Sequence, residues 1–381
     1  MIEEKKNIQI TLPDLFVGFM ARKPVIHQDY EHVRIVSESW LSDLCDFPPK
    51  LRKTVHEIDI AYYTAILIPH VDTDRFRTVC DWMNWVFPFD DALDNGPLKE
   101  KPEDVRELVD GLIGILGTKT TQDYQNKLLV AFQSIWLRVF QDSSPGIQRR
   151  FSSSMRDYCE AVFQQVVIQK GNGQKQLGLK ATLQMRRQSV ATMPLLALVE
   201  YAHGLRIPEI VFESNSIKEI QRIGTEVVLL QNDLISYRKE KALDESYNII
   251  SIYQQQGYTV QEAFNKVERS LSECYRDWYL ALAQLPSWGE EIDSQVQLYI
   301  DGVQNAALAN IHWSFRVDRY WENTQEVRKT RTFWIPADTV TSKQRKIDFK
   351  IWNGVILLSA LVLLVAVVLI LVVPRVLDSA S

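Results

Sequence analysis

The stretch FPFDDALDN, residues 87–95, places three aspartates beside the apolar and aromatic run VCDWMNWV. Carboxylates are rarely found next to a buried apolar surface unless a partner compensates their charge. On a helix that begins near Asp74, Asp90 and Asp94 are four residues apart and share one face. Two negative charges at a helix C-terminus are unfavourable, because they repel each other and oppose the helix dipole. Such an oxygen-only cluster favours a hard cation such as Mg²⁺, and the alternative is a solvated acidic helix end before a turn.

A second polar group follows an apolar run in VVLLQNDLISYRKE, residues 227–240. Asn232, Ser236 and Glu240 are spaced by four residues each, so all three side chains lie on one helical face. They can offer an amide oxygen, a hydroxyl and a carboxylate to one ion. The alternative is an ordinary amphipathic helix with a polar stripe, but the aspartate cluster makes a shared cation site the favoured interpretation.

The rest of the chain up to residue 330 repeats apolar residues at spacings of three and four, which is typical of helices. Proline- and glycine-containing breaks such as FPPK (47–50), DNGP (94–97) and SSPG (143–146) separate these segments. This pattern predicts about ten helices joined by short loops, in a single all-α domain over residues 1–330.

Composition excludes several classes of function. The net charge of −5 argues against nucleic acid as a partner. The four cysteines are far apart, without zinc-ligand spacing, and indicate reduced thiols in a cytosolic domain.

The C-terminus contains GVILLSALVLLVAVVLILVV, residues 354–373, which carries no charge over 20 residues. A helix of this length spans roughly 30 Å, the thickness of a bilayer core. We therefore expect a transmembrane tail anchor at residues 351–374, after a polar and basic linker at 331–350 and before a short tail at 375–381. A buried core helix is the alternative. The positive charges concentrated before the span place the preceding domain in the cytosol, with the endoplasmic reticulum as the expected membrane of this single-pass protein.

Four segments together resemble one family. DDALD and NDLISYRKE are similar, in the same order, to the two metal motifs of class I terpene synthases of the fungal sesquiterpene cyclase type. WSFRVDRYW, residues 313–321, resembles the family's C-terminal Arg–Tyr pair, here Arg319 and Tyr320. LQMRRQSVATMP, residues 183–194, resembles the helix break that carries a diphosphate-sensing arginine.

The resemblance implies a helix bundle around a deep apolar pocket, with farnesyl diphosphate held at the pocket mouth by three Mg²⁺ ions. Asp90 and Asp94 would bind two ions, and Asn232, Ser236 and Glu240 the third. The diphosphate ligands implied are Arg319, Tyr320, Lys239 and an arginine at 186 or 187. The residues expected to be essential for catalysis are Asp90, Asn232, Ser236, Glu240, Arg319 and Tyr320. The aromatic candidates for the pocket wall are Phe87, Trp313, Tyr62 and Tyr63.

Two criteria disagree on the sensing arginine. If Arg187 is the sensor, Ala191 stands where many family members have a glycine. The family's usual spacing of 46 residues before Asn232 instead selects Arg186. Both residues stay candidates.

The function implied is a Mg²⁺-dependent sesquiterpene synthase that ionises and cyclises farnesyl diphosphate to a hydrocarbon or alcohol. One alternative is a terpene synthase that uses a C10 or C20 prenyl diphosphate. A second alternative is a catalytically inactive, membrane-tethered homologue. The expected partners are the prenyl diphosphate and, through the C-terminal helix, the membrane; a homodimer is an open alternative for the oligomeric state.

Overall fold

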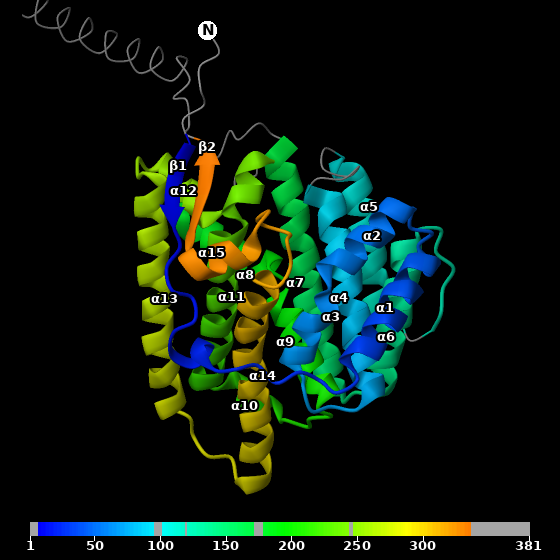
Figure 1. The fold of residues 1–381 in the computed structure, drawn as a ribbon. Coiled ribbons are helices and arrows are strands. Elements are labelled where there is room, and N and C mark those ends of the chain that lie inside the picture. The colour runs from blue at the N-terminus through cyan, green and yellow to red at the C-terminus, as the bar shows by residue number, and fades with distance from the viewer. Residues whose placement is uncertain (1–6, 95–100, 119, 171–177, 244–246, 337–381) are drawn as a thin grey trace, which may run out of the picture. The chain divides into compact units, whose positions relative to one another are not determined.

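The computed structural model describes residues 7–94, 101–118, 120–170, 178–243 and 247–336. Helices make up most of this part of the chain (Figure 1). The long helices are α4 (Thr73–Asp94), α7 (Pro145–Lys170), α11 (Asn215–Ala242), α13 (Val260–Ala283) and α14 (Glu290–Ser314). The others are α1 (Tyr30–Leu44), α2 (Pro49–Ile58), α3 (Ile60–Leu67), α5 (Pro102–Leu116), α6 (Lys127–Gln141), α8 (Leu179–Ser189), α9 (Thr192–Ala202), α10 (Glu209–Glu213), α12 (Ile249–Gln255), α15 (Thr324–Thr330) and the 3-10 helix η1 (Gly18–Ala21).

The chain divides into two compact units, residues 10–333 and a unit formed by residues 1–9 and 334–381. The first unit contains every helix of the described residues. Of the second unit, only residues 7–9 and 334–336 are described, and they belong to the paired strands β1 (Asn7–Thr11) and β2 (Thr332–Pro336). The predicted linker at 331–350 therefore begins with a strand.

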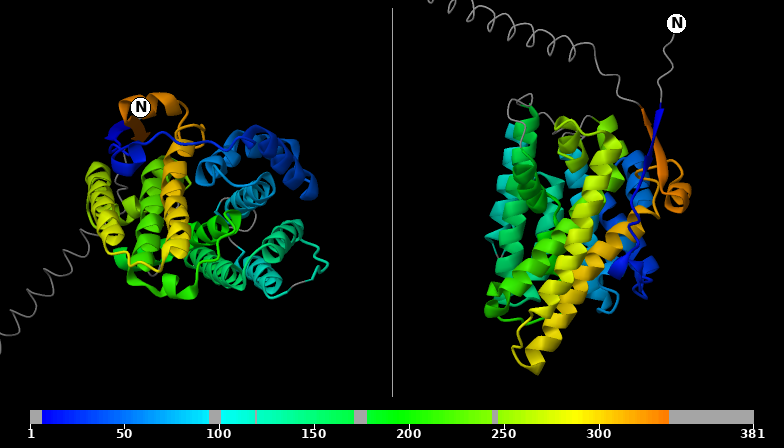
Figure 2. Two further views of the ribbon diagram at one scale, coloured as in Figure 1. Left: turned by 90° about the horizontal axis from the view of Figure 1, so that it is seen from below. Right: turned by 90° about the vertical axis from the view of Figure 1, so that its left-hand side faces the viewer.

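Close backbone packing fixes the position of α14 against its neighbours in the unit of residues 10–333 (Figure 2). A Cβ atom added at Gly224 of α11 would lie 2.3 Å from Cγ1 of Val303. A Cβ atom at Gly302 of α14 would lie 2.3 Å from Cγ1 of Val199 in α9. Because only glycine allows such an approach, α14 lies tightly against both α11 and α9.

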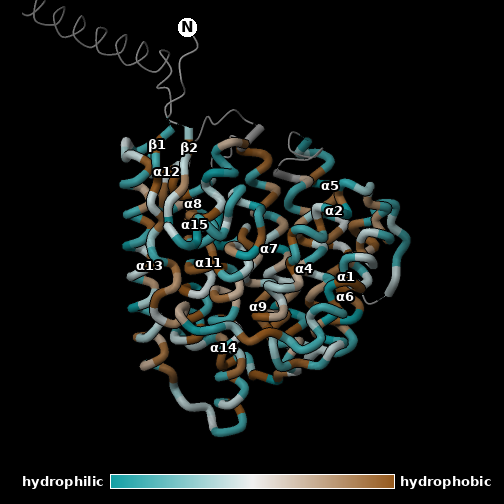
Figure 3. The backbone as a smooth tube through the Cα atoms, in the orientation of Figure 1, coloured by the Kyte–Doolittle hydropathy of each residue, from teal (hydrophilic) through white to brown (hydrophobic). Residues whose placement is uncertain are grey.

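Helix α9 forms part of the core of this unit. All of its residues except Met193 are buried, and Figure 3 shows hydrophobic residues along it. A mostly apolar helix that is buried on all sides must be surrounded by other elements. Helices α7 and α14 pack directly against α9, and α4 and α11 also contact it.

The predicted helical fold is confirmed apart from the strand pair β1–β2, but its C-terminal part needs a correction. In the described ranges, the structure contains no helix that is both long enough and apolar enough to cross a membrane. The predicted span at 351–374 lies outside the described residues. The fold that the structure describes therefore does not include the predicted transmembrane helix, and the membrane location stays a prediction from the sequence.

Candidate active site

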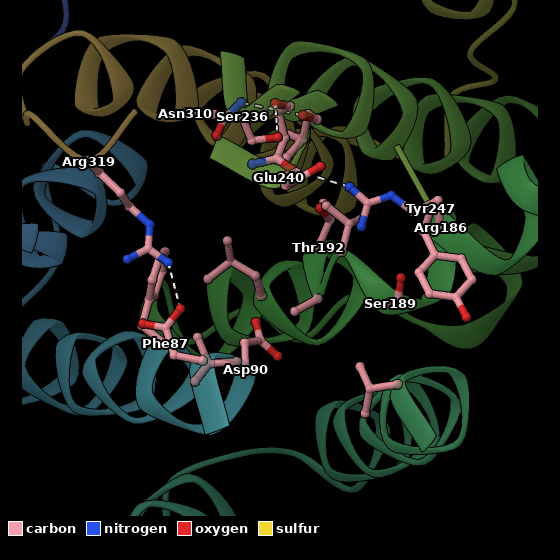
Figure 4. Close-up of a pocket in the computed structure, with 18 of the residues that line it drawn as sticks. Phe87, Asp90, Arg186, Ser189, Thr192, Ser236, Glu240, Tyr247, Asn310 and Arg319 are labelled. Carbon is pink, nitrogen blue, oxygen red and sulfur yellow. Dashed lines mark hydrogen bonds and ion pairs between the residues drawn. The ribbon is translucent and has the colours of Figure 1, made fainter. Parts of the chain in front are cut away.

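A cavity lies between α4, α7, α9, α11 and α14 (Figure 4). One part of its lining is apolar and buried: Trp82, Met83, Val162, Val166, Leu195 and Val228. The other part is polar and partly buried: Asp90, Asp91, Arg186, Asn232, Lys239, Glu240 and Arg319. The polar residues therefore lie at the opening of a cavity whose inner wall is apolar.

Asp90 lies near the C-terminal end of α4, the helix predicted to begin near Asp74. The hydroxyl of Tyr158 in α7 donates a hydrogen bond to its carboxylate. Burial nevertheless raises the pKa of Asp90 to about 7, and the nearby charge of Asp91 adds to the shift. The positive charges of Arg319 and Arg186 offset only part of this shift, and a bound cation would stabilise the ionised carboxylate further.

Asp91 and Arg319 form an ion pair across the opening. Nη2 of Arg319 donates to Oδ1 of Asp91 at 2.9 Å, and the guanidinium lies over the ring of Phe87, 5.4 Å from its centroid. The sequence left the role of Asp91 open, and the structure places it as the residue that orients Arg319. Asp94 is the last residue of α4, and its side chain is outside the described part of the structure.

Asn232, Ser236 and Glu240 line the cavity from α11, as their spacing predicts. Ser236 donates its hydroxyl proton to the carbonyl of Asn232 at 2.7 Å. Glu240 accepts a hydrogen bond of 2.9 Å from the side-chain amide of Asn248. In Figure 4, Ser236 and Glu240 lie across the cavity from Asp90.

The donor set fits a metal ion that is completed by other ligands. Among the described residues, no three histidine, cysteine, aspartate or glutamate side chains form a metal site by themselves. The oxygens present are carboxylates on two facing helices, one amide and one hydroxyl. Mg²⁺ is commonly held by one or two carboxylates with water and substrate phosphate, so this arrangement suits Mg²⁺ brought together with a phosphate ligand.

The structure brings Arg186 into the cavity and places Arg187 elsewhere. Nη2 of Arg186 donates to Oδ1 of Asn232 at 3.2 Å and to Oδ1 of Asp233 at 2.5 Å. Arg187, the next residue of α8, forms an ion pair with Glu226 and does not line this cavity. The spacing of 46 residues before Asn232 therefore selected Arg186, the arginine that lines the cavity.

The break between α8 and α9 follows directly after these arginines. Ala191 has φ 57° and ψ 13°, the left-handed conformation that glycine adopts readily and alanine does not. Ala191, which would stand in the place of the family's glycine if Arg187 were the sensor, thus has a glycine-type backbone conformation.

Replacing Ala191 by glycine should raise the free energy of unfolding by about 0.5–1 kcal/mol, because relief of the left-handed strain exceeds the entropy that glycine loses on folding. The same change at Ala181, an exposed residue in the right-handed first turn of α8, should lower it by about 0.5–1 kcal/mol. Urea denaturation of both variants measures the difference. Equal destabilisation by the two substitutions would show that Ala191 is not strained.

Three of the four predicted aromatic residues line the cavity. Phe87 and Trp313 make an edge-to-face contact with centroids 5.3 Å apart, and the hydroxyl of Tyr63 donates to the carbonyl of Ala306 at 2.9 Å. Tyr62 does not line the cavity, and the guanidinium of Arg316 lies over its ring at 4.2 Å. Lys239 and the buried Tyr320 complete the predicted residues at the opening.

Three residues of the site were not predicted from the sequence. Tyr158 holds Asp90, Asn248 holds Glu240, and the fully buried Asp233 holds Arg186. Asp233 also accepts the backbone N–H of Ile249 at 2.7 Å. Its position directly after Asn232 was a usable signal, whereas Tyr158 in α7 and Asn248, the N-cap residue of α12, carry no local signal.

Comparison with known proteins agrees with this geometry. Residues 81–277 match the family model for terpene synthase family 2, C-terminal metal binding. The chain belongs to the terpene synthase family. The terpene synthase is thus a lyase of the terpene cyclase type, and the matched metal-binding domain supports the use of a divalent metal.

Its relatives include fungal enzymes similar over most of their length. The terpene synthase is 35% identical to a silphinene synthase of Penicillium patulum, over 86% of this chain and 90% of the relative. It is 36% identical to terpene cyclase 4 of Gibberella fujikuroi, over 88% and 92% of the two chains. The structure of an α-eudesmol synthase, at 17% identity, matches its fold with a TM-score of 0.71 over 77% of this chain and 97% of that one.

Proposed function

We propose that this terpene synthase ionises farnesyl diphosphate and cyclises the product cation to a sesquiterpene hydrocarbon or alcohol, with release of diphosphate. The observation that carries the proposal is the division of the cavity lining. Carboxylate, amide and hydroxyl oxygens and two arginines meet at the opening, and apolar side chains line the wall behind them. A prenyl diphosphate has the same division between a polyanionic head and an apolar tail.

Asp90 with Asp94 would hold two Mg²⁺ ions, and Asn232, Ser236 and Glu240 a third. When bound, Mg²⁺ would supply a Lewis acid that stabilises the negative charge of the leaving group. The carboxylates of Asp90 and of the facing Glu240 are the acidic ligands that the described side chains offer for this purpose.

The arginines act on the diphosphate directly. When the bond between the allylic carbon and oxygen breaks, the oxygen keeps the electron pair and the carbon becomes a cation. Arg186 and Arg319 can donate several N–H bonds to the diphosphate oxygens where this negative charge develops. Asp233 and Asp91 already hold the two guanidinium groups in place, so little reorganisation is needed when the substrate binds.

The apolar wall protects the cation after ionisation. Val162, Val166, Leu195 and Val228 offer no nucleophile and exclude water from the inner cavity. An aromatic face stabilises a nearby cation by about 0.5–2 kcal/mol. Phe87 and Trp313, which pack together on this wall, are the aromatic residues proposed for that role.

The purified full chain should release diphosphate from farnesyl diphosphate when Mg²⁺ is present and stop when EDTA removes the metal. Gas chromatography of the extracted product should show a cyclic C15 compound. Parallel reactions with geranyl and geranylgeranyl diphosphate test the C10 and C20 alternatives. No metal-dependent release from any of the three substrates would refute the proposed function and support an inactive homologue.

A further inference from the structure

A second cavity of about 430 Å³ lies on the other side of α9 from the active site. Met193 and Ala197 of α9 line it, whereas Thr192 and Leu195 of the same helix line the active-site cavity. The volume is within the range of known small-molecule sites, about 300–1,000 Å³. Helix α9 thus forms a wall shared by two separate cavities.

The inner surface of the second cavity is apolar and buried. Phe212 of α10 and Tyr299 of α14 make an edge-to-face contact with centroids 5.4 Å apart, and both are buried beside Ala197. The hydroxyl of Tyr299 already accepts a hydrogen bond of 2.8 Å from the side-chain amide of Gln221. These side chains form a hydrophobic pocket whose tyrosine has a partner inside the protein.

The buried charges at this cavity neutralise each other. Arg150 of α7 donates from Nε and Nη2 to the two carboxylate oxygens of Glu200, at 3.0 and 2.6 Å. Its guanidinium also lies over the ring of Phe212, 3.8 Å from the centroid. A charged ligand would compete with this buried pair. Of the other charged residues in the lining, Arg187 and Arg222 are paired with Glu226, and Asp157 and Lys218 are exposed, so the inner cavity does not favour a charged ligand.

Two polar atoms of the lining have no hydrogen-bond partner, the hydroxyl oxygen of Thr225 and Nε of Arg187, whose Nη2 is paired with Glu226. Thr225 of α11 is 2% exposed and lines the cavity, and its hydroxyl oxygen has no hydrogen-bond partner. A buried hydroxyl left without a hydrogen bond costs about 1–3 kcal/mol, and such groups are rare in folded proteins. The cost is removed when a molecule in the cavity bonds to the hydroxyl.

We propose that this cavity is a second binding site, for a compact, uncharged apolar molecule with one hydroxyl or carbonyl oxygen that bonds to Thr225. The apolar wall accounts for the carbon skeleton of the ligand, and the paired Arg150 and Glu200 account for its lack of charge. The unpartnered hydroxyl of Thr225, which is the more deeply buried of the two groups, accounts for the oxygen. The site does not depend on the substrate proposed for the active site.

Camphor, a compact apolar ketone, is a suitable probe, and isothermal titration calorimetry with the full chain measures its affinity. Thr225→Val keeps the side-chain volume and removes the hydroxyl, so camphor should bind about three- to tenfold more weakly. Ala197→Phe fills the cavity and should abolish binding. Thr192→Val is the matched control, because Thr192 is equally buried on α9 but lines the active-site cavity, and it should leave the affinity unchanged.

Three results would overturn the proposal. The first is an absence of camphor binding by the wild-type chain up to the solubility limit of the probe. The second is equal affinity in the wild type and the Thr225→Val variant. The third is weakening by Thr192→Val alone, which would locate the probe in the active-site cavity. Thr225→Val decides the question even if Ala197→Phe fails to fold.

Discussion

The Asp90→Asn variant should lose about a hundred- to a thousandfold in kcat and keep its fold. The substitution preserves side-chain volume but removes the negative charge that would attract Mg²⁺ at the opening of the cavity, and losing one such electrostatic contribution typically costs this much. Stability should not fall. Burial raises the pKa of Asp90 to about 7, so above that pH the metal-free protein carries an unfavourable buried charge that asparagine lacks.

Diphosphate release measures kcat, and circular dichroism measures the melting temperature. Asp74→Asn is the control, because Asp74 lies in the exposed first turn of the same helix and lines no described cavity. It should turn over at the wild-type rate. If Asp90→Asn also turns over normally, Asp90 has no part in binding the metal.

Replacing Arg186 by lysine should lower kcat/KM by about ten- to a hundredfold, whereas Arg187→Lys should change it by less than about threefold. Lysine keeps the charge that balances the buried Asp233 but loses the planar fork that can donate to diphosphate and aspartate together. Arg187 carries the same side chain one residue later, and its ion pair with Glu226 lies outside the active-site cavity. Comparing the two variants therefore shows whether the reaction requires an arginine at position 186 or only an arginine in this part of α8.

Steady-state assays at several substrate concentrations measure both variants, and thermal melts check that each is folded. Equal losses in the two would indicate that α8 as a whole, and not Arg186, supports the reaction. A loss confined to Arg187→Lys would assign the sensing role to that residue.

The elements that carry the metal ligands were predictable because their chemistry is local. The start of α4 near Asp74 follows from helical periodicity, and the common face of Asn232, Ser236 and Glu240 follows from spacing alone. The structure places Asp90 across the cavity from Glu240 (Figure 4). These predictions needed only the geometry of single helices.

Two helix breaks were not predictable from glycine or proline. The chain turns at Asp59, between α2 and α3, and at Ala191, both with positive φ. Neighbouring residues of the same type also point in different directions. Tyr63 faces the cavity and Tyr62 packs under Arg316, while Arg186 faces the cavity and Arg187 does not. Tertiary packing decides each of these cases, and residue type does not.

The ion pair between Asp91 and Arg319 has a consequence for synthesis of the enzyme. Its two residues are 228 positions apart in the sequence. After the ribosome has synthesised Asp91, it must therefore translate nearly all of the remaining helical unit before Arg319 is present. Contacts between such distant residues form slowly, and exposed apolar surface on incomplete chains promotes aggregation. Nascent chains that stop before residue 319 would expose the apolar side chains of the cavity and would lack the Arg319 guanidinium that pairs with Asp91 at its opening. We expect such chains to bind chaperones.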